Sequence, residues 1–224
     1  MTHDGPTSDA PTPGASSDGV LSVLLAMAML VLVVDTSLMN VSISAVVRDL
    51  DTTVSGVQSA IALEALVSAA FILISSKVGD LIGRKLAYTI GLLGYATGAI
   101  AMVLAQELWM IVVFWAIVGG LGASLLLPAM QSLIHGNFEG AAQQRAYAMV
   151  GASAAIAAAV GPLLGGFVTT YLSWRVGFAL EAVIIAIVLL GLGRVRDAVF
   201  TGDRSIDYGS AGLSWWSWQA TGVS

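Results

Sequence analysis

Three carboxyl side chains interrupt long apolar stretches of this sequence: Asp35, Glu64 and Glu181. If these stretches cross a membrane, a charge at mid-membrane costs about 2.5–3.5 kcal/mol on insertion scales, so such residues usually face a polar cavity. We therefore expect Asp35 and Glu64 to line a central polar cavity, where one of them takes up and releases a proton. Glu181, nearer the outer surface, is a third candidate for this pathway. The alternative is a structural role, with each acid hydrogen-bonded to neighbouring helices.

The composition makes lipid the expected solvent for most of the chain. Hydrophobic residues make up 57% of the 224 residues and charged residues only 10%, whereas a soluble domain carries about 25% charged residues. Too few charges remain to cover a surface that faces water. Because the chain has no cysteine, and because His3 and His135 are far apart, we expect no metal site and no cofactor. A net charge of −5 without a basic cluster argues against nucleic acid as a partner.

The apolar residues fall into six runs, each long enough to cross a bilayer as a helix at about 1.5 Å per residue. The runs cover approximately residues 20–47, 57–74, 86–104, 108–134, 147–171 and 176–192. They are continuous rather than alternating, which favours helices over the strands of a barrel. The sequence thus predicts an all-α membrane protein with a six-helix bundle over 20–194. Residues 1–19 are expected to form a disordered tail, and residues 195–224 a linker and an aberrant or truncated tail.

Positive charges between the runs predict the orientation of the helices, since cytoplasmic loops are enriched in lysine and arginine. The loops on one side hold Lys77, Arg84, Lys85, Arg145, Arg194, Arg196 and Arg204, and those on the other hold Arg48 and Arg175. The first side is therefore expected to be cytoplasmic, with both chain ends on that side. We expect a multi-pass protein of the cell inner (plasma) membrane, with Trp109 and Trp174 in the interfacial belt.

The segment between the second and third runs carries the first recognisable motif. Residues 76–85 read Ser-Lys-Val-Gly-Asp-Leu-Ile-Gly-Arg-Lys, which resembles the signature loop of the major facilitator superfamily of transporters. The matching positions are Asp80, Gly83, Arg84 and Lys85. The resemblance implies a cytoplasmic loop that helps to set the inward- and outward-facing equilibrium. Alternatively, it is only a basic connector that obeys the positive-inside rule.

Three further motifs resemble the same family, in the same order along the chain. Residues 34–41, which include Asp35 and Asn40, are similar to the first span of drug:proton antiporters, especially the fourteen-span branch. The resemblance adds Asn40 to the candidates for the substrate or proton pathway. Gly161, Pro162, Gly165 and Gly166 are similar to the end of the antiporter motif in the fifth span, and residues 173–178 to the start of the sixth. In the fourth span, Ala116 stands where the family carries an arginine linked to proton coupling. That difference puts the usual proton route in question.

The resemblance implies one six-span half of a secondary transporter for small molecules, with multidrug or metabolite efflux driven by an ion gradient as the expected function. The expected partners are the bilayer, a small-molecule substrate, protons, and either a missing C-terminal half or a second copy. The alternative is a non-transporting membrane remnant or assembly partner. Enzyme activity is not expected, because no nucleophile–base pair or phosphate-binding loop is recognisable.

The C-terminal residues suggest why the chain is short. Residues 206–213 resemble the start of a seventh span, after which the sequence turns to Trp-Trp-Ser-Trp-Gln at 215–219. Codons for that stretch, read one base earlier, encode an apolar run. We therefore predict a frameshift near Leu213 in the gene or in its sequence. The alternative is a genuine short protein whose tryptophans lie at the membrane interface.

Overall fold

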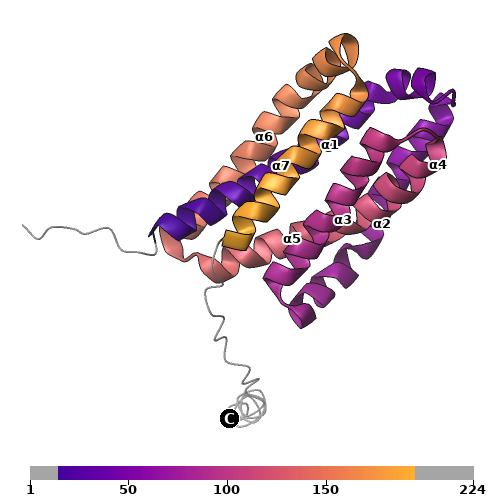
Figure 1. Ribbon diagram of the computed structural model, residues 1–224. Helices are drawn as coiled ribbons and strands as arrows, with labels where there is room; N and C mark the ends of the chain where they lie inside the picture. The colour runs from indigo at the N-terminus through magenta and orange to yellow at the C-terminus, as the bar shows by residue number, and fades with distance from the viewer. Residues whose placement is uncertain (1–14, 195–224) are drawn as a thin grey trace, which may run out of the picture.

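The computed structural model describes residues 15–194, and these form a bundle of long helices packed side by side (Figure 1). The elements are α1 (Ala15–Asp49), α2 (Val54–Ile82), α3 (Arg84–Leu104), α4 (Leu108–Met110), the π-helical stretch η1 (Ile111–Gly119), α5 (Gly120–Asn137), α6 (Gly140–Tyr171) and α7 (Trp174–Arg194). Because α4, η1 and α5 follow one another without a break, they form one span, Leu108–Asn137. Six helices in the described part are long and apolar enough to cross a membrane, which confirms the predicted fold class.

The helices extend beyond the apolar runs that predicted them. Helix α2 continues eight residues past position 74, to Ile82, and α6 begins at Gly140, before the run at 147. Helix α1 begins at Ala15, so its first turns lie in the segment expected to be a tail. The polar helix ends fit a bilayer, because side chains beyond the hydrocarbon core reach headgroups and water. The expected linker and the tryptophan-rich segment at 215–219 lie outside the described residues.

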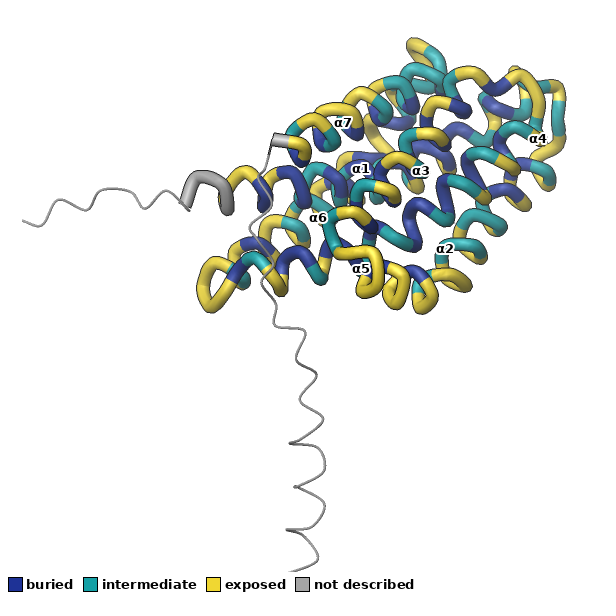
Figure 2. The backbone as a smooth tube through the Cα atoms, turned by 60° about the horizontal axis from the view of Figure 1, so that its bottom comes forward, coloured by how far each residue is buried: buried dark blue, intermediate teal, exposed yellow. Residues whose placement is uncertain are grey.

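Exposed residues lie on all the helices of the bundle (Figure 2), and many of them are large and apolar. Leu73, Leu163 and Leu190 are 78%, 74% and 64% exposed. Many large apolar residues on several helices share this exposure. An exposed apolar surface on this scale is not a property of soluble monomers, and it marks a contact with lipid or with other protein. Helices α2 and α6 are the least buried of the six spans.

Two apolar clusters fill the interior, one towards each end of the bundle. The first contains Leu25, Val31, Leu126 and Ile185, and the second contains Leu38, Met102, Trp115 and Phe178. On α1 the boundary between them falls after Val31 and before Leu38, and on α7 it falls after Phe178 and before Ile185. Buried polar residues lie at this boundary on both helices. The core therefore has a polar layer between two apolar ones.

The bundle consists of two groups of helices that meet along α3 and α7. Helix α1 packs chiefly against α6 and α7, and α3 packs chiefly against η1 and α5 (Figure 1). Small residues permit this close packing in lipid. A Cβ atom on Gly122 would lie 2.7 Å from the Gly91 carbonyl oxygen and 2.7 Å from the Tyr95 backbone nitrogen. Glycine at 122 therefore allows the backbones of α5 and α3 to touch.

Candidate functional site

The polar layer is centred on Asp35, which is only 2% exposed. Asp35 lies on the buried face of α1 together with Ala28, Val31 and Leu38, at the three- and four-residue spacing that places side chains on one side of a helix. This face turns towards the interior of the bundle. Asp35 therefore lies among the helices of the bundle and not on its outer surface.

Two aromatic side chains from other helices lie next to the Asp35 carboxyl group. The indole Nε1 of Trp115, in η1, donates a hydrogen bond to Asp35 Oδ1 at 3.1 Å, and Tyr95, in α3, lies close enough to interact with the same carboxyl group. Both side chains lie on the buried faces of their helices. A buried carboxylate is tolerable only when donors compensate for its lost hydration. Trp115 supplies such a donor.

Glu181, in α7, meets Asp35 in the same layer. It is 4% exposed, and its carboxyl group lies close enough to that of Asp35 for the two to interact. Its second oxygen, Oε2, is buried and has no hydrogen-bond partner. Buried residues of α7 recur around it at Trp174, Phe178 and Ile185, so Glu181 belongs to the core-facing stripe of this helix. The structure thus brings together two of the predicted pathway residues.

The other two predicted pathway residues lie elsewhere. Glu64, in α2, is partly buried and close enough to Asp35 to interact with it electrostatically, and its backbone packs against Gly120 of α5. Asn40 is exposed, and its side-chain amide donates to the Thr36 carbonyl oxygen of its own helix at 2.7 Å. Glu64 therefore borders the layer, whereas Asn40 faces away from it.

Ala116 is fully buried in the cluster that also holds Trp115 and Phe178. The neighbouring indole is the group of this helix that reaches Asp35. The groups next to Asp35 at this level are therefore two aromatic side chains and a second carboxyl group, not a guanidinium. The sequence reasoning did not single out Tyr95 or Trp115. In the sequence, both residues are aromatic residues within apolar or glycine-rich stretches. Many other aromatic residues in membrane helices have the same setting.

The signature loop forms a tight connection between α2 and α3. Gly83 lies between the two helices with φ +99°, a backbone conformation that residues other than glycine rarely adopt. The guanidinium of Arg84 donates to the Ser132 carbonyl oxygen at 3.0 Å, near the C-terminal end of α5, where cations are favoured. Arg84 thus ties the loop to the fourth span, while Asp80 is exposed and Lys85 partly buried.

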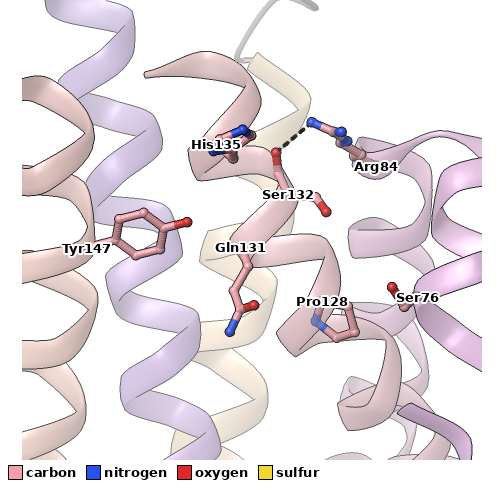
Figure 3. A pocket seen from close by; sticks show the side chains of 7 residues that line it. All are labelled: Ser76, Arg84, Pro128, Gln131, Ser132, His135 and Tyr147. Atoms are coloured by element: carbon pink, nitrogen blue, oxygen red, sulfur yellow. Dashed lines mark hydrogen bonds between the residues drawn. The ribbon is translucent and has the colours of Figure 1, made fainter. Parts of the chain in front are cut away.

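A cavity of about 260 Å³ lies beside this connection. It is lined by Ser76, Arg84, Pro128, Gln131, Ser132, His135 and Tyr147. Figure 3 shows Tyr147 of α6 on one side and Arg84 of α3 on the other, with the α5 residues between them. The predicted loop residue Arg84 therefore borders a polar recess as well as bonding to α5.

The glycine–proline motif of α6 packs against α1. A Cβ atom on Gly161 would lie 2.9 Å from the Ser37 Cβ atom, and one on Gly165 would lie 3.4 Å from the Leu38 Cα atom. Pro162 is exposed and Gly166 is partly buried. The two buried glycines therefore allow α6 to approach α1 directly beside Asp35.

At the opposite end from the signature loop, α1, α3 and α7 are joined by one cluster of side chains. Asp49 accepts hydrogen bonds from the Trp174 indole at 3.1 Å and from the Arg175 guanidinium. Arg175 also donates to the carbonyl oxygen of Ala105, just after α3. Trp109 is 54% exposed, whereas Trp174 is 2% exposed. Trp174 lies at the start of α7, and the protein covers its side chain.

Comparison with known proteins identifies the family. Residues 25–220 match the family model of the Major Facilitator Superfamily. The puromycin resistance protein pur8 of Streptomyces alboniger is 30% identical over 170 residues, which cover 75% of this chain and 34% of that protein. The tetracenomycin C resistance and export protein of Streptomyces glaucescens is 27% identical over 201 residues, which cover 88% of this chain and 37% of that protein.

A solved structure shows the same fold. The peptide transporter POT, crystallised as an E310Q mutant in complex with sulfate, aligns with a TM-score of 0.62 over 80% of this chain and 37% of its own length. The sequence identity is 17%, so this likeness concerns the fold alone. The chain spans about a third of the length of the curated relatives it matches.

Proposed function

Because the chain belongs to the Major Facilitator Superfamily, we propose that it is the N-terminal half of a secondary transporter that exports small organic molecules, driven by an ion gradient. The observation that carries the proposal is the carboxyl group of Asp35, held 98% buried at the level where the four helices α1, α3, η1 and α7 meet. A deeply placed ionisable group in a membrane protein is a candidate for ion coupling. The two relatives whose names report antibiotic resistance support efflux.

A complete transport site needs a second half. Transporters of this kind are built from two six-helix repeats, with substrate bound near the midplane at the interface between them. We propose that α2 and α6, the least buried spans, contribute to that interface. The second half would be a C-terminal half or a second copy of this chain.

We also propose that the protein lies in the plasma membrane with both chain ends in the cytoplasm. The unequal distribution of lysine and arginine between the two sides supports this orientation. The signature loop is then cytoplasmic, and Asp80, Gly83, Arg84 and Lys85 act in the conformational switch. The bond between Arg84 and Ser132 joins α3 to α5 in this state; breaking it would release the loop.

An efflux assay tests the proposal. The gene and the DNA downstream of it are expressed together in a drug-sensitive bacterial host. The retention of a panel of fluorescent and antibiotic compounds by these cells is then measured with and without a proton gradient. We expect gradient-dependent loss of at least one compound, abolished by Asp35→Asn and retained by Glu107→Gln, which changes an exposed acid. Equal retention in cells with and without the gene, for every compound, would contradict the proposal.

A further inference from the structure

We infer that the recess between α2, α3, α5 and α6, at the signature-loop end of the bundle, is a binding site for a phosphate group. An anionic phospholipid headgroup or free phosphate could supply that group. The recess lies at the end of the bundle, apart from the buried layer around Asp35, and a ligand there does not depend on the proposed transport.

The side chains that line the recess are rich in hydrogen-bond donors. Arg84 carries a permanent positive charge and five N–H groups, and its Nη1 donates to the Ser132 carbonyl oxygen at 3.0 Å. Ser76, Gln131 and Tyr147 add hydroxyl and amide donors, and Figure 3 shows the Tyr147 hydroxyl turned from α6 towards α5. Within the described part of the chain, no acidic residue lines the recess. A guanidinium with neutral donors and no carboxylate favours an anion.

His135 adds a ring N–H group to these donors. The side-chain nitrogen of Gln143 lies 3.0 Å from His135 Nδ1. An amide nitrogen can only donate, so Nδ1 accepts and the proton of the neutral imidazole is on Nε2. Because His135 lines the recess, Gln143 in this way sets Nε2 as a donor at its edge.

The C-terminal end of α5 borders the recess and would by itself repel an anion. Its carbonyl oxygens, however, already accept hydrogen bonds: that of Ser132 from Arg84, and that of Ile134 from the Phe138 backbone N–H at 3.1 Å. On the other side, α3 begins at Arg84, and no side chain among the described residues caps its first turn. The positive end of the α3 dipole therefore adds to the charge of the guanidinium.

Basic residues outnumber acidic ones around the recess. Four basic residues lie at this end of α2, α3 and α6, against two acidic residues at or beside the helix ends. The basic ones are Lys77, Arg84, Lys85 and Arg145, and the acidic ones are Asp80 and Glu139. Clusters of lysine and arginine beside membrane helices attract anionic headgroups, and basic pockets between such helices bind them.

The position of the recess matches that of headgroup phosphates. Ser76 follows the apolar run that ends at 74, and Tyr147 begins the run over 147–171, so the recess lies where the hydrocarbon-spanning parts of the helices end. Gln131, His135 and Tyr147 are exposed, which leaves the recess open to a group that enters from outside. Its volume of about 260 Å³ is below the range of about 300–1,000 Å³ usual for small-molecule pockets. A headgroup therefore fits better than a drug-sized substrate.

Thermal unfolding of the purified full chain in a neutral detergent tests the inference with two probes. Inorganic phosphate is titrated in one arm, and phosphatidylglycerol is added to the micelles in the other. A ligand that binds the folded chain raises the unfolding temperature, so each arm gives an apparent affinity. We expect the double variant Gln131→Leu/Tyr147→Phe, which leaves Arg84 in place, to bind about tenfold more weakly because two hydrogen bonds to a charged group are lost. Tyr171→Phe is the matched control, since Tyr171 is an exposed tyrosine at the other end of α6.

The two arms distinguish the sources of the phosphate group. A shift with phosphatidylglycerol alone assigns a lipid headgroup, and a shift with inorganic phosphate, alone or in both arms, assigns a site that also accepts free phosphate. If the double variant does not fold, His135→Phe serves as the second variant, because it removes the Nε2 donor and keeps a ring.

Three results would overturn the inference. The first is the absence of a shift with both probes, and the second is equal affinity in the wild type and in the variant. The third is the same shift with sodium chloride at equal ionic strength or with diacylglycerol, which lacks the phosphate. Loss of binding when the gene is expressed with its downstream DNA would likewise overturn it, since a second half of the transporter would then cover the recess. Efflux is not measured here, so failure of the proposed function leaves these results unchanged.

Discussion

The indole of Trp115 and the carboxyl group of Asp35 are 80 positions apart in sequence, yet Nε1 lies 3.1 Å from Oδ1 in the buried layer of the bundle. This bond joins η1 to α1, two segments that otherwise pack mainly against different neighbours. The indole nitrogen is a donor only, so its role here is to stabilise negative charge on Asp35.

Trp115→Phe removes this donor and keeps an aromatic ring in the core. We expect the free energy of unfolding in mixed detergent micelles to fall by about 1–2 kcal/mol, because a hydrogen bond to a buried charged group is lost. Trp109→Phe is the matched control, since Trp109 is more than half exposed. Equal stability of the two variants would show that the bond to Asp35 contributes nothing.

Gly122 is the position where α5 comes closest to α3. In Gly122→Ala the new methyl group would meet the backbone atoms of Gly91 and Tyr95 at 2.7 Å, so the two helices must separate. We expect a loss of about 1–3 kcal/mol of stability from overpacking. Gly151→Ala, in α6, should be neutral because nothing lies within 4 Å of its Cβ position. Thermal unfolding of the purified variants, monitored by size-exclusion chromatography, compares their stabilities. If Gly122→Ala is as stable as the wild type, the contact between α3 and α5 can relax freely.

The sequence could predict the six spans because a continuous apolar run of that length has few alternatives in lipid. It also drew attention to Asp35 and Glu181, since acids in apolar runs are conspicuous. It could not predict that these two acids lie in the same buried layer, because that depends on where α1 packs against α7. Tyr95 and Trp115 were missed for the same reason: before the helices are packed, a donor to Asp35 looks like any other core aromatic residue.

A substitution at Gly83 tests the backbone conformation of the signature loop without introducing a packing clash. Its φ is +99° and nothing lies within 4 Å of its Cβ position, so Gly83→Asn introduces backbone strain of about 1–3 kcal/mol and little else. Gly140, with φ +53° and equally open space, lies in the left-handed region that asparagine tolerates. Gly140→Asn should therefore be nearly neutral, and protease sensitivity of the loop should rise only in Gly83→Asn. Equal sensitivity in both variants would argue against a strained turn at Gly83.

Asp49 and Arg175 join the C-terminal ends of α1 and α3 to the start of α7, where Trp174 also donates to Asp49. In Asp49→Asn the carboxylate charge is lost, so the guanidinium loses its ion-pair partner and keeps the Ala105 carbonyl oxygen and the Trp174 ring, whose centre is 4.5 Å away. We expect faster hydrogen exchange at the ends of α1 and α7, and a destabilisation of roughly 1–2 kcal/mol, because the cluster is partly exposed and screened. Asp51→Asn is the matched control: Asp51 is exposed with φ 46°, a conformation that asparagine also adopts. If both variants exchange at the wild-type rate, the contacts of Asp49 do not hold these helix ends together.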